Sequence, residues 1–345
     1  MANPCTVEYA ARFVDRSGAT VADALSLTSV EWTRMLNGAS TATVVVNPEG
    51  DCCAEMGNVR TWGHAMVLYR NGVFVWSGPV LNAEWGRDEV TVQAVDMSGW
   101  LARRVPHSNN TFTDTDLTDI AAWLIADGFA PDDPGHTVSI VAPAGVRGGR
   151  SYLTNVGQTL DHLTDLSDTG VDWTVVGTRF VILPDSWNES VGSLNDGDMP
   201  GGMTAAEDGS ALTTRWVVAG GSNHDLVGEA GGIDPFYGLL EQYEEQSSVT
   251  SVEAAVSAAN AKLAVSRNSP VFIDTQEVTI SPEAAIDIRT LVPGWSLDMA
   301  TTATCRNIGQ RLKIVGLHVV MQEEGEEIKV SVASGDFGFV DLSGL

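Results

Sequence analysis

Two clusters of acidic residues are the first candidates for chemistry in this sequence, because carboxylate oxygens are the ligands that hard cations prefer. Asp114, Asp116 and Asp119 lie close together in the stretch DTDLTD. They lack the glycine and the distal glutamate of a calcium-binding loop, so we interpret them as caps of the helix that follows. The stretch NDGD, from Asn195 to Asp198, is interpreted as a polar turn. Neither cluster is predicted to bind a metal.

The sequence also lacks the spacings that mark nucleophilic, zinc or phosphate sites. No two of the histidines are four residues apart, as on a zinc-binding helix, and no GxSxG motif is present. The stretch AGVRGGR, from Ala144 to Arg150, is not followed by Lys-Ser/Thr and is interpreted as a connection between strands. We therefore predict no catalytic residue, no metal ligand and no cofactor. The six histidines are His64, His107, His136, His162, His224 and His318.

A carbohydrate-active or cell-surface-binding protein is the alternative interpretation. The 45 Asp and Glu residues allow many carboxylate pairs of the kind that glycosidases use, but nothing marks one pair. Ten tryptophans are present, and Trp32, Trp76, Trp85 and Trp173 lie within strand patterns, where burial is expected. The sequence thus favours a protein that is not an enzyme, with a glycosidase-like activity as the lesser alternative.

The charge of the chain is strongly negative. The sequence has 19 Lys and Arg against 45 Asp and Glu, a formal net charge of −26, which disfavours tight binding to nucleic acid. The first residues do not have the basic and then apolar pattern of a signal peptide, and no apolar run has the length of a membrane span. Cys5, Cys52, Cys53 and Cys305 lack zinc-site spacing and are expected to be reduced thiols. We expect a soluble protein made in a cytoplasm.

The clearest local signal is a β-hairpin in the stretch VLYRNGVFVWSGPV, from Val67 to Val80. Asn71 and Gly72 separate two runs of aromatic and β-branched residues, which predicts a two-residue turn with positive φ at both positions. Trp76 is predicted to be buried in the resulting sheet. Similar short strands and turns fill the first hundred residues, a pattern typical of a sandwich or barrel.

The pattern along the chain predicts a β-rich α+β protein in three parts. Residues 1–105 are expected to form a β-barrel, residues 106–200 a small α+β module, and residues 201–345 a second barrel with one inserted helix. That helix is predicted in the Ala-rich stretch SVEAAVSAANAKLAVSR.

The middle part is expected to contain two helices and a hairpin. The first helix is predicted to begin after the cluster of Asp114, Thr115 and Asp116 and to stop at Gly128. The hairpin is predicted in VDWTVVGTRFVILPD, with Gly177 near its turn. The second helix is predicted to end at Gly170, with an apolar face made of Val156, Leu160, Leu163 and Leu166.

Three stretches of the first hundred residues carry an ordered set of motifs. The stretches are SLTSVEWTRMLNGASTATVVV, YRNGVFVWSGPV and DEVTVQAVDMSGWLARR. Together they resemble the N-terminal domain of tailed-phage baseplate-hub or tail-tip proteins, the minor tail proteins of long-tailed actinobacterial phages. GQTLDHLTDLSDTGVDWTVVG is similar to the helix–hairpin module of that family, and RWVVAGG and LVPGWSLDM to strands of its second barrel. The structural signature comprises Trp32, Asn71, Gly72, Trp76, Gly78, Pro79, Asp96 and Trp100, accompanied by Arg34, Val75, Leu101, Arg103 and Arg104.

The resemblance implies a structural virion protein. Each chain of a homotrimer would supply two tail-tube-like barrels, so that three chains build a six-part ring that joins the tail tube to the tip. The ring would form a channel through which DNA passes transiently and without specific binding. The implied partners are further copies of the chain, distal tail or tail-tube proteins, and tip or fibre proteins. The implied location is the virion tail tip, after assembly in the host cytoplasm.

Overall fold

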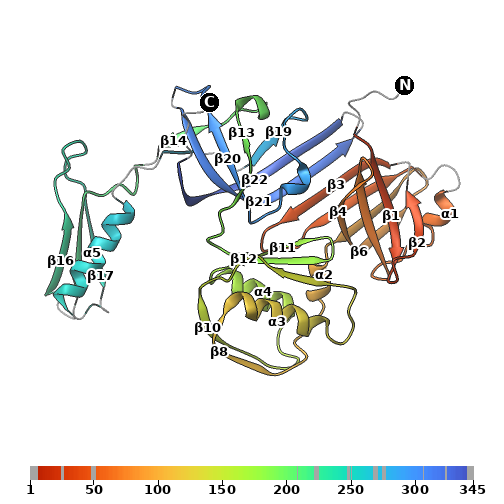
Figure 1. The fold of residues 1–345 in the computed structure, drawn as a ribbon, viewed down its shortest axis with the longest axis horizontal. Helices are drawn as coiled ribbons and strands as arrows, with labels where there is room; N and C mark the ends of the chain where they lie inside the picture. Colours follow the sequence, from red (N-terminus) through yellow and green to blue (C-terminus); the bar gives the residue numbers. More distant parts are fainter. Residues whose placement is uncertain are drawn as a thin grey trace. The chain divides into compact units, whose positions relative to one another are not determined.

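The computed structural model divides the chain into two compact units (Figure 1). Unit 1 consists of Met1–Met203 and Thr275–Leu345, and unit 2 consists of Thr204–Asp274. Within the described part of the chain, no helix combines the length and the apolar character needed to cross a membrane. The structure describes residues 7–24, 27–47, 52–207, 209–220, 225–246, 249, 251–266, 271–273, 277–305, 307–322 and 325–339.

Unit 1 is built around one twelve-stranded sheet, whose hydrogen-bonded path runs β13-β20-β21-β3-β4-β7-β6-β5-β1-β2, with β22 on β21 and β19 on β22. All of these pairs are antiparallel except β13 with β20. Among the described residues this path has two ends and does not close into a barrel. The strands are β1 (Tyr9–Asp15), β2 (Thr20–Ala24), β3 (Leu27–Met35), β4 (Thr41–Val46), β5 (His64–Arg70), β6 (Val73–Trp85), β7 (Val90–Val95), β13 (Ser190–Leu194), β19 (Glu277–Ile280), β20 (Ser296–Thr301), β21 (Ile308–Gln322) and β22 (Gly325–Phe339).

The sheet combines strands from both ends of the sequence. β3 pairs with β21 so that Trp32 lies opposite Val319, and β4 continues the sheet on the other side of β3. Alternate residues of β4, Ala42, Val44 and Val46, are buried, which is the period-two burial expected for a strand with one face in the core. The prediction of a β-rich protein is therefore confirmed. The division at residues 105 and 200 stays a prediction.

The predicted hairpin turn is confirmed. β5 ends at Arg70 and β6 begins at Val73, so the turn has two residues, and φ is +51° at Asn71 and +74° at Gly72. The prediction for Trp76 is also confirmed, since its side chain is 3% exposed.

A small module in unit 1 packs two helices on a three-stranded sheet of order β11-β12-β9. Asp116 caps the first helix by accepting a hydrogen bond from the Thr118 N–H group, as the capping interpretation predicted. Phe129, Trp173 and Phe180 are fully buried in the core between these elements. The elements are α2 (Ser98–Leu101), β8 (Asn110–Asp116), α3 (Leu117–Phe129), β9 (Thr137–Ile140), β10 (Arg147–Tyr152), α4 (Thr159–Ser167), β11 (Val171–Val176) and β12 (Arg179–Pro184).

Two details of the predicted helices are wrong. Gly128 does not stop α3, which continues to Phe129, because Gly128 is a packing position: an added Cβ would lie 2.9 Å from Leu101 and 3.1 Å from Thr159. Val156 does not belong to the apolar face of α4, since the helix begins at Thr159 and the Val156 side chain is 53% exposed. The hairpin of β11 and β12 is confirmed, with Gly177 in its turn at φ +66°.

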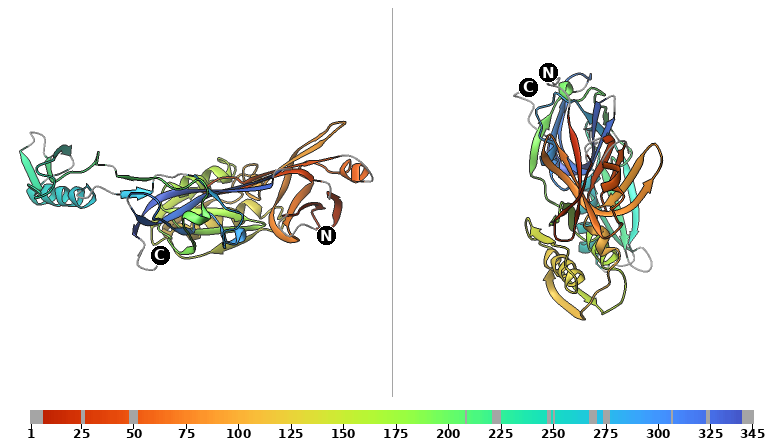
Figure 2. Two further views of the ribbon diagram at one scale, coloured as in Figure 1. Left: turned by 90° about the horizontal axis from the view of Figure 1, so that it is seen from above. Right: turned by 90° about the vertical axis from the view of Figure 1, so that its right-hand side faces the viewer.

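Unit 2 is a three-stranded sheet with one helix packed against it (Figures 1 and 2). β15 (Arg215–Gly220) lies between the antiparallel β16 (Leu226–Gly231) and the parallel β17 (Glu241–Gln246). The Ala-rich helix predicted from sequence is present as α5 (Val252–Ser266), and it packs on β15 and β16. The remaining pair is β14 (Ala205–Glu207) with β18 (Val271–Ile273). Short helices of unit 1 are α1 (Cys52–Met56) and the 3₁₀ helices η1 (Asp196–Asp198) and η2 (Ile288–Thr290).

Candidate functional site

Trp32 and Arg34 lie on β3 and are both buried, with exposed fractions of 0% and 2%. The Arg34 guanidinium lies 5.1 Å from the centre of the Trp32 ring and donates to the carbonyl oxygen of Val75 at 2.7 Å. Burial lowers the pKa of Arg34 to about 10, which still leaves it charged at neutral pH. Within the described residues this cation is held by carbonyl oxygens and by an aromatic ring, with no carboxylate in an ion pair. The Arg34 side chain therefore connects β3 with β6, through Val75, and with η2 and the residue after it, through Arg289 and Leu291.

The tip of the hairpin borders a pocket of about 310 Å³. Asn71, Val73, Ile286 and Arg289 are among the residues that line it. The turn itself is fixed, because the Asn71 side chain accepts from the Glu8 N–H group at 2.9 Å. The pocket holds apolar side chains and arginines whose charges are already neutralised, such as Arg289 beside Asp287. It shows no nucleophile paired with a base, the pattern that acyl-transfer chemistry needs.

Gly78 and Pro79 mark the point where β6 leaves β5 and joins β7. An added Cβ on Gly78 would lie 1.9 Å from the carbonyl oxygen of Val95, so only glycine fits there. Pro79 is the partner of Ala65 in the β5–β6 ladder, and the next residue of β6, Val80, pairs with Ala94 of β7. Gly78 thus allows the backbone of β6 to pass close to the end of β7, at the point where β6 changes its partner from β5 to β7.

Asp96 follows β7 and is 1% exposed. Its carboxylate accepts from the Ser40 N–H group at 2.8 Å and from the Ser98 N–H group at 2.9 Å. Burial raises the pKa of Asp96, against the opposing effect of these hydrogen bonds. The geometry is that of a carboxylate that fixes the start of α2 and the loop before β4. It does not show an acid exposed to a substrate.

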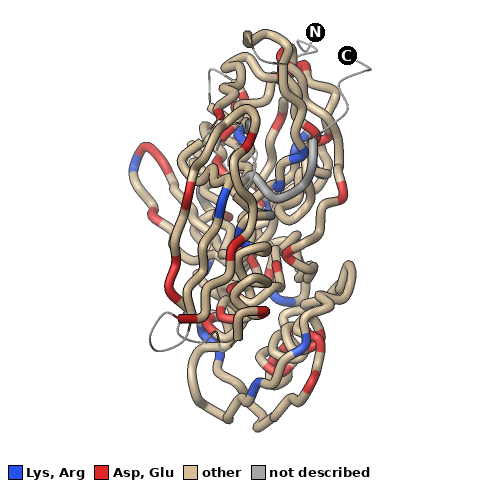
Figure 3. Tube along the Cα trace, turned by 90° about the vertical axis from the view of Figure 1, so that its left-hand side faces the viewer, with Lys and Arg blue, Asp and Glu red and all other residues tan. Residues whose placement is uncertain are grey.

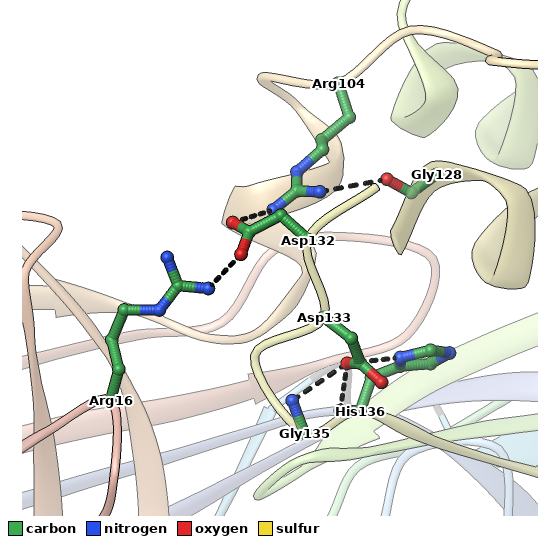
Figure 4. A network of polar contacts seen from close by, with 7 residues as sticks. All are labelled: Arg16, Arg104, Gly128, Asp132, Asp133, Gly135 and His136. Atoms are coloured by element: carbon green, nitrogen blue, oxygen red, sulfur yellow. Dashed lines mark hydrogen bonds and ion pairs between the residues drawn. The ribbon is translucent and has the colours of Figure 1, made fainter. Parts of the chain in front are cut away.

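Trp100, on α2, lies at a joint between β1, the end of α2 and the loop after α3. Arg16 and Arg104 both bind the Asp132 carboxylate, at 2.6 and 3.2 Å (Figure 4). Their guanidinium groups lie 5.9 and 5.8 Å from the centre of the Trp100 ring. Figure 4 also shows Arg104 donating to the carbonyl of Gly128 at the end of α3. The hydrogen bond from Arg16 lowers the pKa of Asp132. This network holds the α+β module against the β1–β2 hairpin.

A second joint, which the sequence did not reveal, connects the module to the main sheet. Lys313 of β21 forms a buried ion pair with Asp172 of β11 and also donates to the carbonyl of Asp185 at 2.6 Å. Asn37, after β3, donates to Asp172 at 2.6 Å and accepts from the N–H group of Trp173 at 2.8 Å. Because Lys313 and Asp172 are 141 residues apart, no local pattern could have indicated this pair.

Tyr9, Arg70 and Glu326 form a third cluster of polar contacts between elements that are far apart in the sequence. Glu326, on β22, accepts from the Tyr9 hydroxyl at 2.7 Å and from Nε and Nη2 of Arg70 at 2.8 and 2.5 Å. Burial, and then the neighbouring Glu326 carboxylate, raises the pKa of Tyr9. These contacts connect β1 and β5 of the N-terminal part to β22.

The stretches considered for chemistry have structural explanations. Asn195 and Asp198 form a capping box on η1, so the stretch NDGD is a turn, as interpreted from sequence. The stretch AGVRGGR leads into β10, which pairs with β8. Among the described residues no group of three or more His, Cys, Asp or Glu could hold a metal ion. Cys305 is an exposed free thiol, while Cys5 and His224 lie outside the described residues.

Acidic residues outnumber basic residues along the chain, 45 to 19. Figure 3 shows Asp and Glu more frequent than Lys and Arg along the trace. The two kinds are not distributed evenly, since residues 1–105 contain eight Lys and Arg against eleven Asp and Glu, whereas residues 106–203 contain three against fourteen. The excess of negative charge therefore comes mainly from outside the N-terminal part.

Comparison with known proteins gives matches in structure alone. No family model matches the chain, and no curated protein matches its sequence. The 43 kDa tail protein of prophage MuSo2 from Shewanella oneidensis is similar with a TM-score of 0.57 and 15% identity, over 94% of this chain and 97% of that one. A tail protein from Neisseria meningitidis MC58 gives 0.56 and 14%, over 96% and 98% of the two chains. The prophage tail protein gp18 from Listeria monocytogenes EGD-e gives 0.52 and 13%, over 94% of both.

These solved structures are tail proteins, two of them from prophages, and the chain shares their fold over nearly its whole length. The resemblance to tail proteins that the sequence indicated is thereby confirmed at the level of the fold.

Proposed function

We propose that the chain is a structural protein of a phage-type tail, a baseplate or tail-tip hub that joins the tail tube to the tip. The observation that carries the proposal is the fold that the chain shares, end to end, with prophage tail proteins. The twelve-stranded sheet supports it, because strands from both ends of the chain build a single wall. The clusters around Arg34, Asp96, Asp132 and Asp172 support it too, because they join elements of the wall and leave no reactive group exposed to a substrate.

The finer assembly is part of the same proposal. Residues 1–105 and 201–345 each contribute a tail-tube-like barrel, and residues 106–200 form the module between them. Three chains then form a ring of six such parts. Within this arrangement the signature residues Trp32, Asn71, Gly72, Trp76, Gly78, Pro79, Asp96 and Trp100 shape the wall and its joints. The chain acts in the virion tail after assembly in the host cytoplasm, with distal tail or tail-tube proteins on one side and tip or fibre proteins on the other.

The charge suits a channel through which DNA passes without being held. Basic walls would bind phosphates and release counterions, and every such contact would slow the DNA. Carboxylates on the wall repel the phosphates over a Debye length of roughly 8–10 Å and keep the duplex mobile. The acidic excess of residues 106–203 makes this module the proposed source of that lining.

Electron cryomicroscopy of the purified chain and of tails that contain it tests the proposal. We expect rings with threefold symmetry, an acidic lumen and a diameter that admits duplex DNA. A basic lumen, or a lumen filled by the ordered core of the ring itself, would refute the channel. Absence of the chain from tails would refute the hub. Specific binding of cell-wall glycans by a monomer would favour the alternative of a carbohydrate-active or cell-surface-binding protein.

A further inference from the structure

A shallow groove of about 580 Å³ lies on the surface of unit 1. Its lining residues come from the segment before β4, from the turn before β5, from β6 and β7, from α2 and the residues after it, and from the residue before α4. The apolar part includes Leu81, which is 44% exposed although it lies on a strand of the main sheet. The residues that matter for binding are Trp62, Leu81, Gly99, Ala102, Arg103 and Gln158.

Trp62 is held in a strained conformation at the edge of this groove. Its φ is +59°, in the left-handed region that bulky residues rarely adopt. The N–H group of Trp62 donates to the carbonyl of Val80 at 2.7 Å, and its ring packs edge-on against Trp100 at 5.0 Å. Strain that the surroundings maintain in this way is typical of binding surfaces.

Arg103 is the one charged residue among the described residues that line the groove, and it is a cation in a strongly negative chain. The Arg103 guanidinium lies 4.9 Å from the centre of the Trp62 ring. Arg103 is exposed, as is Arg60 two residues before Trp62, and in the described structure neither forms an ion pair with a carboxylate. The groove therefore suits an occupant that combines an apolar side chain with negative charge.

Unit 2 carries a segment with that chemistry. Residues 225–246 contain six Asp and Glu and no Lys or Arg. Three of these acids are paired within unit 2, Glu229 and Glu241 with Arg215 and Glu244 with Lys262. Between β16 and β17 this segment exposes Ile233 by 79% and Phe236 by 86%, the two most exposed large apolar side chains among the described residues. Tyr237 packs edge-on against Phe236, with ring centres 4.9 Å apart.

The turn that carries Phe236 is already ordered. The backbone groups of Asp234 and Gly238 exchange hydrogen bonds of 2.8 and 2.9 Å. The Asp234 carboxylate also accepts from the N–H groups of Phe236 and Tyr237 at 2.8 and 3.0 Å. Because the turn is fixed in advance, binding through Phe236 would lose less conformational entropy than binding through a flexible loop.

We propose that the Phe236 turn of one copy of this chain docks into the Trp62–Arg103 groove of a second copy. The two surfaces differ, so the contact is heterologous, and its repetition closes into a ring or extends into a filament. Pairing of the acidic segment with itself is disfavoured because like charges would meet across the contact. That the repetition closes after three copies rests on the proposed trimeric hub, whereas the contact itself rests on the groove and the turn.

Photo-crosslinking from position 236 tests the contact. Full-length chain with p-benzoylphenylalanine in place of Phe236 is mixed with isotope-labelled chain at about 100 µM, a concentration that populates even weak contacts. We expect cross-links between copies to peptides that contain Trp62, Leu81 or Arg103. Their yield should fall between about 0.05 and 0.5 M salt, because the charged part of the contact is screened. Cross-links confined to one copy, cross-links to other peptides, or none between copies would each overturn the proposal.

Two matched variants distinguish this contact from nonspecific association between copies of the chain. Arg103→Glu should lower the intermolecular yield about tenfold, as expected for the loss of a central charged residue of an interface. Arg87→Glu is the control, since Arg87 is also exposed, in the turn between β6 and β7, and lies outside the groove. Equal losses in the two variants would overturn the proposal. Threefold rings seen in tails without this cross-link would reject the contact and keep the hub, whereas the cross-link without incorporation into tails would reject the hub.

Discussion

Unit 1 has several fully buried large aromatic side chains, although Trp85, for which the sequence led us to expect burial, is 50% exposed, whereas unit 2 leaves many of its large apolar side chains exposed. Trp32, Trp173 and Phe13 are fully buried in unit 1. Unit 2 holds 71 of the 345 residues, yet nine of the eighteen exposed large apolar side chains of the described residues belong to it. The described residues between its sheet and α5 include a small buried cluster of Val218, Ala230 and Ala259.

The difference has a physical origin in the side chains at the helix–sheet contact. Glycine and alanine let α5 approach the sheet closely: an added Cβ on Gly228 would lie 2.2 Å from the backbone of Ala255. Close approach of small residues buries little apolar area, and small units bury a smaller fraction of their surface in any case. Unit 1 therefore supplies most of the folding free energy, and the exposed surface of unit 2 is available for contacts between chains.

The largest loss of stability that tests the contrast between unit 1 and unit 2 is expected at Trp76. Trp76→Ala should lower the free energy of unfolding by about 3–5 kcal/mol, because the side chain is 3% exposed and its removal leaves a cavity. Trp85→Ala on the same strand is the control, with a side chain that is 50% exposed and an expected loss of about 1 kcal/mol or less. Urea unfolding followed by circular dichroism measures both. A loss below about 1 kcal/mol at Trp76 would show that this wall is not tightly packed.

The joint between the module and the main sheet should be nearly as sensitive. Lys313→Met removes one partner of a buried ion pair and leaves Asp172 buried beside Asn37, at an expected cost of about 3 kcal/mol. Arg215→Gln in unit 2 breaks exposed ion pairs with Glu229 and Glu241 and should cost about 0–1 kcal/mol. If thermal unfolding showed equal losses of stability for the two variants, the contrast between the buried interactions of unit 1 and the exposed ones of unit 2 would be wrong.

Gly228→Ala tests how unit 2 holds its helix. The new methyl group would overlap the backbone of α5, so we expect a loss of about 2 kcal/mol confined to unit 2. Hydrogen exchange read by mass spectrometry should show faster exchange in β15, β16 and α5 and unchanged exchange in β3 and β21. Gly201→Ala, where an added Cβ meets no atom within 4 Å, should change stability by less than about 0.5 kcal/mol. Faster exchange throughout both units would indicate that they unfold together.

The smallest effect concerns the cap of α3 and depends on pH. Burial alone would raise the pKa of Asp116, but hydrogen bonds from Thr118, Ala144 and Gly145 lower it overall. A lowered pKa in the folded state stabilises the fold above about pH 3.9, the value for an unfolded chain, and this stability is lost as the pH falls further. Asp116→Ala should therefore cost about 1 kcal/mol at pH 7, and the difference from the unmodified chain should shrink in acid.

Asp119→Ala, in the first turn of the same helix, is the control for the cap. Asp119 is exposed and accepts no capping hydrogen bond in the described structure, so its loss should cost only a few tenths of a kcal/mol. A difference at Asp116 that persisted undiminished in acid would contradict the linkage to its carboxylate.

The sequence by itself determined the local elements of this protein. The turn at Asn71 and Gly72, the cap at Asp116 and the hairpin around Gly177 were all predictable, because each depends on the conformational preferences of a few adjacent residues. Positive φ favours glycine and asparagine, and a capping aspartate satisfies N–H groups that the helix leaves free. Such effects act over one or two turns of chain and can be read from a short stretch.

Tertiary structure alone decided which elements meet. The pairing of β3 with β21 puts Trp32 opposite Val319, and the ion pair of Lys313 with Asp172 joins residues 141 positions apart. The same dependence explains the wrong stop at Gly128, a glycine required by the approach of Leu101 and Thr159 and not by the end of a helix. A strand pattern fixes which face is buried but leaves open which neighbour covers it, since any apolar face of matching shape satisfies the hydrophobic effect. The choice among those neighbours is made by the packing of the whole unit at once.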